Sequence, residues 1–345
     1  MTPYSKLIVY YFSGTGNSKN IAIWLSEVAL EKNMKFELNN ITQCNKHNIL
    51  SPPPNVLLAF VSPIHGFNYP IIMLKFILQF PKGKNNILLL NTRGGLLAGK
   101  KIIPGVTGLA FYVSACILKI KKYSIKAMYP VNLPSNWTFL HPGLKQEAVT
   151  YMHIINKEKI RNFARKVFDG KSNYKGLYEI IQDSIAAPIS ILYFFIGRFF
   201  FTKTYLSSRE CNHCNICINN CPKKAIITID KRPFWTFKCE NCMKCIANCP
   251  QKAIQITHGL FTLYILLFYV FFINTFFFYF ELYIFEIESQ LAKNIIETGL
   301  CLGLFAAWYR LIHFLIRVPF FERIMSYTSL TKLRFWRRYK ALENV

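Results

Sequence analysis

The chain has 345 residues, enough for two small domains and an additional segment. It carries 42 Lys and Arg against 17 Asp and Glu, a formal charge of +25 at pH 7, and 52% of its residues are hydrophobic. We expect no nucleic acid partner, because no binding motif accompanies this charge and net charge alone indicates only nonspecific attraction. The positive charge suits an anionic membrane surface or an acidic protein partner.

The N-terminal part of the sequence alternates between strand-like and helix-like segments. This alternation predicts a doubly wound parallel sheet, in which a mononucleotide binds beyond the carboxyl ends of the strands. We expect no secretory signal, because the first residues lead directly into a strand. The predicted strands are residues 7–12, 35–41, 55–61, 85–91 and 123–131, and the predicted helices are residues 20–31, 70–80, 104–119 and 144–168.

A glycine-rich and hydroxyl-rich turn joins the first predicted strand to the first predicted helix. Backbone N–H groups of such a turn and of the helix N-terminus converge on one point, which predicts a phosphate site. The turn lacks the lysine of a nucleotide-hydrolysing P-loop and the Gly-x-Gly-x-x-Gly spacing of dinucleotide sites, which favours a terminal monophosphate. Its residues are Ser13, Gly14, Thr15, Gly16, Asn17 and Ser18.

Two further loops, residues 62–70 and 91–95, follow the third and fourth predicted strands. The first turn resembles the FMN phosphate loop of flavodoxins, and these two loops resemble the pair that grips the flavin ring in that family. Arg93 stands where flavodoxins commonly stack an aromatic residue, and its charge would stabilise an anionic reduced flavin. His65 is either a turn residue or a hydrogen-bond partner of the flavin. The resemblance implies ring contacts from Ile64, His65, Gly66, Phe67, Thr92, Arg93, Gly94 and Gly95.

A nearly apolar stretch follows at residues 185–201. Pro188 and Arg198 interrupt it, and its length is at the lower limit for crossing a bilayer. We therefore expect an interfacial or core-packed helix here rather than a membrane span.

Eight of the eleven cysteines form two copies of one pattern, 28 positions apart. Thiolates at this spacing hold iron, whereas zinc sites use paired Cys-x-x-Cys knuckles and cysteines this close cannot pair locally without strain. The pattern resembles bacterial two-cluster ferredoxins, where the fourth cysteine of each run serves the other 4Fe-4S cluster. One cluster would use Cys211, Cys214, Cys217 and Cys249, and the second Cys239, Cys242, Cys245 and Cys221.

Two apolar segments near the C-terminus, residues 260–280 and 296–316, predict a transmembrane helical hairpin. The connecting segment, residues 281–297, contains four acidic residues and one lysine, whereas the tail from residue 321 is strongly basic. Because positive segments stay inside, we expect a multi-pass protein of the cell membrane with its redox domains and both termini in the cytoplasm. The basic tail would lie on anionic lipid.

The layout is similar to flavodoxin and ferredoxin fusion proteins of anaerobic bacteria. The expected fold class is α/β, a flavodoxin-like doubly wound parallel sheet, followed by a two-cluster ferredoxin-like domain and a C-terminal transmembrane hairpin. The expected parts are an FMN-binding domain (4–170), an apolar linker or interfacial helix (171–206), a ferredoxin domain (207–257), the hairpin (258–320) and a basic cytoplasmic tail (321–345).

The sequence contains no paired carboxylates, no Ser/His/Asp set and no activated thiol, so we assign no catalytic residue. Clusters move one electron at a time and a flavin one or two, which predicts a membrane-anchored electron carrier rather than a dedicated oxidoreductase. It would connect a soluble low-potential donor, such as an acidic ferredoxin or flavodoxin-type carrier, with a membrane or soluble acceptor. Two alternatives stay open: a flavin-dependent reductase of quinone or a small oxidant, and a redox-responsive scaffold with structural clusters.

Overall fold

The computed structural model describes residues 2–44, 49, 51–259, 262, 266 and 289–342. The chain divides into two compact units. Unit 1 combines Met1–Arg198 with Glu240–Ala247 and Arg337–Val345, and unit 2 consists of Phe199–Cys239 and Asn248–Trp336. The first predicted membrane span, residues 260–280, and residues 281–288 of the acidic connection lie outside the described residues, apart from Thr262 and Leu266.

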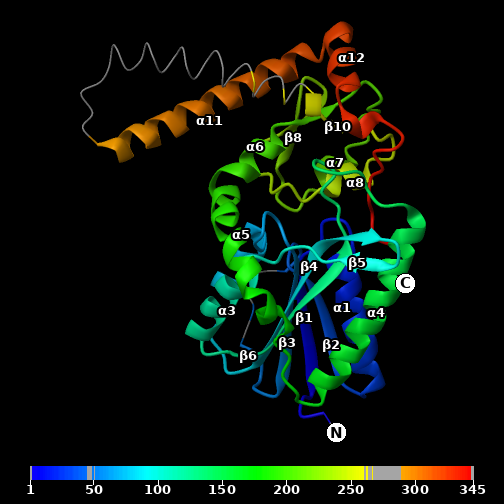
Figure 1. The fold of residues 1–345 in the computed structure, drawn as a ribbon, viewed down its shortest axis with the longest axis vertical. Coiled ribbons are helices and arrows are strands. Elements are labelled where there is room, and N and C mark those ends of the chain that lie inside the picture. The colour runs from blue at the N-terminus through cyan, green and yellow to red at the C-terminus, as the bar shows by residue number, and fades with distance from the viewer. Residues whose placement is uncertain are drawn as a thin grey trace. The chain divides into compact units, whose positions relative to one another are not determined.

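Unit 1 is built on a parallel sheet with helices on both faces (Figure 1). Its parallel strands pair in the order β2-β1-β3-β4-β6, and the short strand β5 pairs antiparallel with the end of β4. The order reverses between β1 and β3, the switch point of a flavodoxin-like sheet. The predicted doubly wound parallel sheet is therefore confirmed. The strands are β1 (Lys6–Tyr11), β2 (Lys35–Asn40), β3 (Val56–Pro63), β4 (Asn86–Ala98), β5 (Lys101–Ile103) and β6 (Ser124–Pro134).

Alternating side chains of the buried strands supply two cores, one on each face of the sheet. Leu7 and Val9 of β1 point into the core beneath α1 (Asn17–Glu31) and α4 (Gln146–Phe168). Ile8 and Tyr10 point into the opposite core. That second core lies beneath α2 (Ile71–Gln79) and α3 (Ala110–Ile120).

Two predicted boundaries in unit 1 differ from the structure by more than three residues. Residues 92–95, expected as a loop, continue β4, because β6 pairs alongside as far as Gly95↔Pro134. The helix expected from residue 104 begins at Ala110. Gly108, just before it, has a positive φ of 62° and its N–H is bound by a carboxylate, which keeps this stretch out of the helix.

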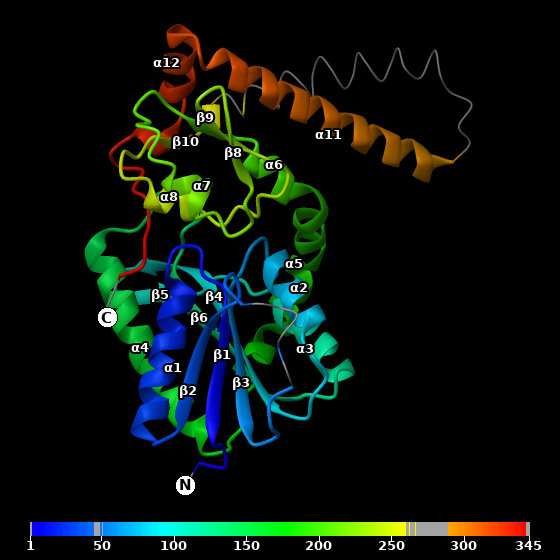
Figure 2. The same cartoon turned by 180° about the vertical axis from the view of Figure 1, so that it is seen from behind.

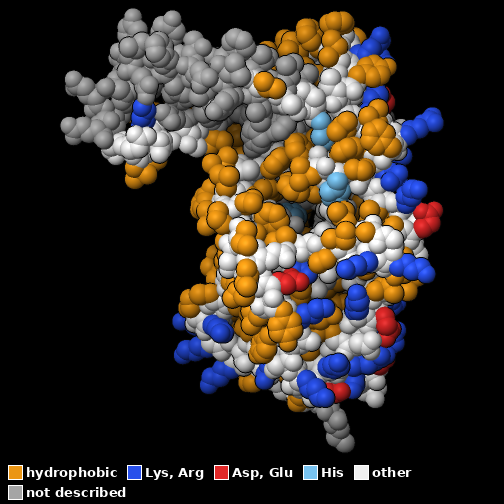
Figure 3. Space-filling view, viewed as in Figure 1, with side chains coloured by type: hydrophobic (Ala, Val, Ile, Leu, Met, Phe, Trp, Pro, Cys, Tyr) orange, Lys and Arg blue, Asp and Glu red, His pale blue; other side chains and the backbone are white. Residues whose placement is uncertain are grey.

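A helical run continues from the 3-10 turn Lys175–Glu179 through α5 (Ile180–Leu192), a π-helical turn (Tyr193–Gly197) and α6 (Arg198–Thr202). Its polar side is bound to the rest of unit 1. The Asp183 carboxylate accepts from Gly108 N (2.7 Å) and from the Tyr112 hydroxyl (3.2 Å). The Ser190 hydroxyl donates to Phe67 O (3.0 Å). Its other side is apolar, and hydrophobic side chains gather over α5 in Figure 3. The exposed ones include Tyr178, Ile181, Ile185, Ile189 and Leu192.

The described residues of unit 2 contain two antiparallel strand pairs. β7 (Tyr205–Ser207) pairs with β10 (Ile254–Ile256), and β8 (Ile226–Ile229) pairs with β9 (Arg232–Trp235). The buried rings of Tyr205 and Trp235 meet edge to face, with centroids 5.8 Å apart. In the described residues of unit 2, the helical elements include most of α6, α7 (Ile216–Asn219), α11 (Gln290–Leu315), α12 (Pro319–Tyr327) and the 3-10 turn Leu330–Lys332. Helix α8 (Lys244–Asn248) belongs to unit 1 except for its last residue.

Helix α11 covers most of the second predicted span, residues 296–316, and begins six positions before it. Its last turns pack on unit 2: the Tyr309 hydroxyl donates to Tyr205 O (2.9 Å), and the His313 ring lies 4.9 Å from that of Phe234. Within the described residues, Lys175–Gly197 and Gln290–Leu315 are long and apolar enough to cross a membrane, by length and composition alone.

The end of the predicted basic tail, from Arg337, belongs to unit 1 and packs against the rest of it. Tyr339 and Ala341 are buried, and Tyr339 packs with Val149 of α4. Gly143 N donates to Arg337 O (2.7 Å), and Ala341 N donates to Thr15 O (2.8 Å). Figure 2 shows this end of the chain beside α1 and α4. Although the segment is strongly basic, two of its side chains, Tyr339 and Ala341, pack beside Val149 of α4.

Candidate functional site

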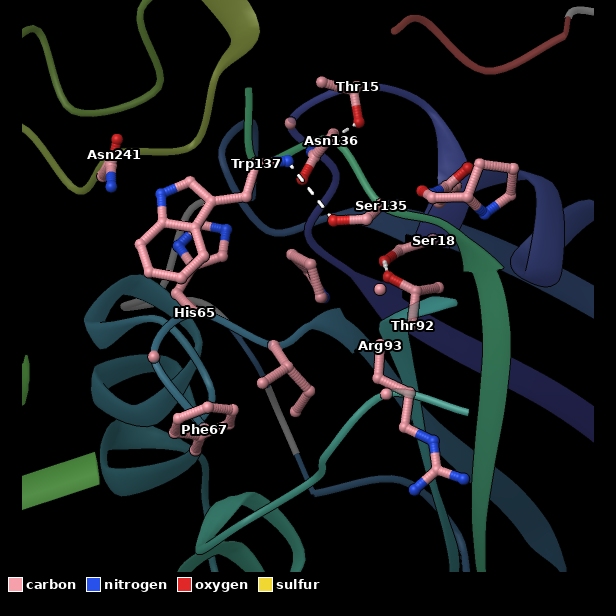
Figure 4. A pocket seen from close by; sticks show the side chains of 18 of the residues that line it. Thr15, Ser18, His65, Phe67, Thr92, Arg93, Ser135, Asn136, Trp137 and Asn241 are labelled. Carbon is pink, nitrogen blue, oxygen red and sulfur yellow. Dashed lines mark hydrogen bonds between the residues drawn. The ribbon is translucent and has the colours of Figure 1, made fainter. Parts of the chain in front are cut away.

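A cavity of about 300 Å³ opens at the carboxyl ends of the parallel strands in unit 1. All three loops singled out in the sequence reach it (Figure 4). Gly16 and Gly95 are the two predicted site residues that do not line it. The predicted residues that do are Ser13, Gly14, Thr15, Asn17, Ser18, Ile64, His65, Gly66, Phe67, Thr92, Arg93 and Gly94.

The hydroxyl-rich turn places buried oxygens beside the first turn of α1. Gly16, with a φ of +109°, takes a conformation that favours glycine, and α1 begins at the next residue. The Thr15 hydroxyl accepts from the Asn136 amide (2.8 Å), and the Ser18 hydroxyl lies 3.2 Å from that of Thr92. A 15-residue helix that starts at such a turn suits an anion at its N-terminus.

The sequence analysis missed a fourth wall of the cavity, the segment after β6. Ser135, Asn136 and Trp137 line it, as does Tyr193 from the π-helical turn. The rings of Trp137 and Tyr193 meet edge to face at 6.3 Å. The only available signal was the position of this segment, which follows a strand at the same edge of the sheet as the predicted loops.

Arg93 lines the cavity, but its guanidinium is paired with a carboxylate, that of Glu179. Its side chain is 2% exposed and forms a two-pronged ion pair with Glu179, with Arg93 Nη2 at 2.8 Å from Glu179 Oε1. Arg93 Nε also donates to Asn132 Oδ1 (2.7 Å), and in Figure 4 the guanidinium extends away from Ser18 and Thr92. The positive charge is therefore balanced by a carboxylate, which the sequence could not show because Glu179 lies 86 positions away.

His65 lies at the edge of the cavity, and its side chain is half-buried. Burial lowers the pKa of His65 to about 4, and a hydrogen bond with the Glu240 backbone opposes part of this shift. The ring is therefore neutral at pH 7. Within the described part of the chain, its Nδ1 atom is buried without a hydrogen-bond partner. A buried ring nitrogen that lacks a partner favours a ligand contact over a turn role.

A second cavity, of about 350 Å³, lies in unit 2. The four cysteines expected to hold the first cluster all line it, although Cys249 comes from the other run. Burial, with further contributions from Cys211, Cys249 and Cys214, raises the pKa of the Cys217 thiol to about 11, as expected where thiols gather. Within the described residues, no group of three or more His, Cys, Asp or Glu is placed to hold a metal ion.

The structure divides the second predicted set of cysteines between the units. Cys242 and Cys245 belong to unit 1, whereas Cys221 and Cys239 belong to unit 2. The prediction that these four hold one cluster stays a prediction.

The two cysteine runs have the same backbone conformation. His213 and Asn241, each before the second cysteine of its run, have φ of 56° and 55°. Asn215 and Met243, each directly after the second cysteine, have φ of 56° and 58°. The last cysteine of each run accepts a backbone N–H at 3.3 Å from the residue four positions on. The sequence repeat is therefore also a structural repeat.

No protein-family model and no curated protein matches the sequence. Among solved structures, the chain is similar to a flavodoxin from the domain Archaea, at 14% identity over 46% of this chain and 99% of that one, with a TM-score of 0.30. It is similar to flavodoxin 1 from Bacillus cereus, at 17% identity over 47% of this chain and 95% of that one, with a TM-score of 0.33. Rubredoxin oxygen:oxidoreductase from Desulfovibrio gigas matches at 13% identity over 48% of this chain and 37% of that one, with a TM-score of 0.30. The fold assignment rests on the strand order of unit 1, not on these likenesses.

Proposed function

We propose that the protein is a membrane-anchored electron-transfer protein that binds FMN in unit 1 and two 4Fe-4S clusters on its eight patterned cysteines. The observation that carries the proposal is the cavity at the β1/β3 switch point. Hydroxyls, a helix N-terminus and close backbone approach meet there in the manner that a flavin mononucleotide requires. Bound FMN would supply chemistry that accepts one or two electrons.

The residues of the cavity fit such a group. Thr15 and Ser18 offer buried hydroxyls to a phosphate beside the first turn of α1. His65 offers its Nδ1 atom to a polar edge of a ring, and Trp137 and Tyr193 offer aromatic surface. The Arg93–Glu179 ion pair leaves no net charge at the second flavin loop, so we no longer expect Arg93 to favour an anionic flavin.

The cysteine sites support iron-sulfur clusters over a single ion. A cubane needs space between its ligands, because it fills the volume that four thiolates surround. The four thiols around the cavity of unit 2 provide that space. The matching backbone of the two runs supports a second cluster of the same type on Cys239, Cys242, Cys245 and Cys221.

Two helices support attachment to a membrane. Helix α11 exposes apolar side chains such as Leu291 and Ile295, and near its end the Tyr309 hydroxyl donates to Tyr205 O. The stretch from Gln290 to Trp308 is about 28 Å long at 1.5 Å per residue, close to the thickness of a hydrocarbon core. Helix α5, with a polar side bound to unit 1 and an apolar side exposed, suits a position in the membrane interface. The cytoplasmic orientation still rests on the charge of the sequence.

Anaerobic purification from the membrane fraction, followed by metal, sulfide and flavin analysis, tests the proposal. We expect about eight iron, eight acid-labile sulfide and one FMN per chain. Stoichiometric zinc without sulfide would contradict the clusters, and absence of flavin would contradict the FMN site. Turnover of a quinone would favour the reductase alternative, and partner binding that survives loss of the clusters would favour the scaffold.

A further inference from the structure

The cysteine loop of the second run is embedded in unit 1. Glu240 and Asn241, between its first two cysteines, are 6% and 5% exposed. Asn212 and His213 occupy the same places in the first run and are exposed. Because the two loops share one backbone conformation, the burial of the second reflects what packs against it.

The polar side chains of this loop contact residues around the flavin cavity. The Glu240 carboxylate accepts from Ile72 N (3.1 Å) in the first turn of α2, and the Glu240 backbone bonds to His65. The Asn241 amide donates to the Tyr193 hydroxyl (3.4 Å), and Asn241 itself lines the cavity. Two cavity residues from different parts of unit 1 are therefore held by this one loop.

The phosphate turn is also shaped to this loop. A Cβ atom added at Gly14 would lie 2.3 Å from the Cys242 carbonyl oxygen, a distance that no side chain can accept. The Cys242 side chain packs against the core beneath α2 and α3, and the Thr138 hydroxyl donates to Met243 Sδ (3.9 Å). Position 14 therefore needs glycine because a cysteine loop more than 220 positions away in the sequence packs against it.

We infer that the loop 240–243, which places Asn241 in the wall of the flavin pocket and packs against residues around it, couples the cysteine set containing Cys242 and Cys245 energetically to flavin binding. The set Cys211, Cys214, Cys217 and Cys249 has no member in unit 1. This inference rests on the proposed function. Because coupling between two sites is reciprocal, ordering the Cys242 loop around its ligand strengthens FMN binding, and bound FMN stabilises the loop.

The two runs supply a matched pair of variants, Asn241→Gly and His213→Gly. Glycine accepts the positive φ at both positions, so each change removes a side chain without straining the loop. Loss of one hydrogen bond and of the cavity contact predicts that Asn241→Gly weakens FMN binding about fivefold or more. His213→Gly should leave the dissociation constant within about twofold, and both variants should keep wild-type iron content, because neither residue is a ligand.

Glu240→Gln provides a second variant that keeps the size of the side chain and one acceptor oxygen. It should weaken FMN binding about threefold, because a charge-assisted bond becomes a neutral one. Glu210→Gln, at an exposed position of unit 2, is its control. Fluorescence titration of FMN and iron analysis give the readouts. Wild-type affinity in both Asn241→Gly and Glu240→Gln would overturn the inference and leave the proposed function intact. A wild-type protein without FMN would instead overturn the proposed function.

Discussion

The two cysteine runs have equal spacing and the same backbone, but they lie in different surroundings. The first run exposes the residues between its first two cysteines and shares a cavity of unit 2 with Cys249. The second run buries the equivalent residues, Glu240 and Asn241, against the flavin cavity of unit 1. The cysteines, which are alike, indicate which group is bound. The residues between them, which differ, decide what the group lies against.

The largest difference is expected between Cys217→Ala and Cys245→Ala, the third cysteine of each run. Each variant should lose about half of the iron, from about eight to about four atoms per chain, because one ligand set is incomplete. Only Cys245→Ala should also release FMN, since its run forms part of unit 1. Iron and flavin analysis after anaerobic purification provides the measurement. Equal FMN retention in both variants would show that the two runs are equivalent.

The double variant Thr15→Val and Ser18→Ala tests whether the flavin depends on the turn beside the second run. Loss of two hydrogen bonds to a charged phosphate predicts about 3 to 6 kcal/mol weaker FMN binding. The iron held by the first run should be unaffected, because its four cysteines belong to unit 2. Flavin titration is the measurement, with the exposed Ser51→Ala as control. Unchanged flavin content would place the phosphate elsewhere.

Gly14→Ala should disturb the second run alone. The new Cβ meets the Cys242 carbonyl at 2.3 Å, so the backbone must move, at a cost of about 1 to 3 kcal/mol in the free energy of unfolding of unit 1. Denaturant unfolding measures this loss. Gly303→Ala in α11, where nothing lies within 4 Å of the added atom, should cost nothing. Equal stability of the two variants would mean that the Cys242 loop does not press on the phosphate turn.

Acidification should weaken unit 1 through His65, which bonds to the second run. Its pKa is about 4 when folded and about 6.5 when unfolded, so the unfolded chain binds more protons between these values. Stability therefore falls as the pH falls from about 6.5 to about 4. His65 should lower the free energy of unfolding by about 2 kcal/mol between pH 7 and pH 5. Unfolding of the wild type and of His65→Gln at both pH values measures it, and an identical pH dependence would contradict the burial of the ring.

The smallest effect is expected at the C-terminal segment, which also touches both the phosphate turn and the second run. The Tyr339 hydroxyl donates to the Asn17 side chain and lies 2.9 Å from His153 Nε2, and Arg338 donates to Ile246 O (3.3 Å). Tyr339→Phe should weaken FMN binding by about 1 kcal/mol, because the buried hydroxyl that holds Asn17 beside the phosphate turn is lost. Tyr327→Phe, exposed in unit 2, is the control. Equal FMN affinities of Tyr339→Phe and Tyr327→Phe in a flavin titration would show that the C-terminal segment does not contribute to the FMN site.

Much of unit 1 could be predicted because its signals are local. The apolar run at residues 7–12 became β1 (Lys6–Tyr11), and the hydroxyl-rich turn after it lines the cavity with five of its six residues. The resemblance of the spacing to two-cluster ferredoxins likewise assigned Cys249 to the first set, and the structure brings it into the same cavity as Cys211, Cys214 and Cys217. Periodicity and spacing depend on neighbouring residues, which the sequence states directly.

The tertiary structure decided what each local feature lies against. Sequence could not pair Arg93 with Glu179, place Trp137 and Tyr193 at the cavity, or bring Tyr339 to Asn17. It could not distinguish the two cysteine runs either, because the equivalent residues became exposed in one and buried in the other. Burial and the partners of charged groups depend on residues distant in the chain, and a pattern of neighbours carries no information about them.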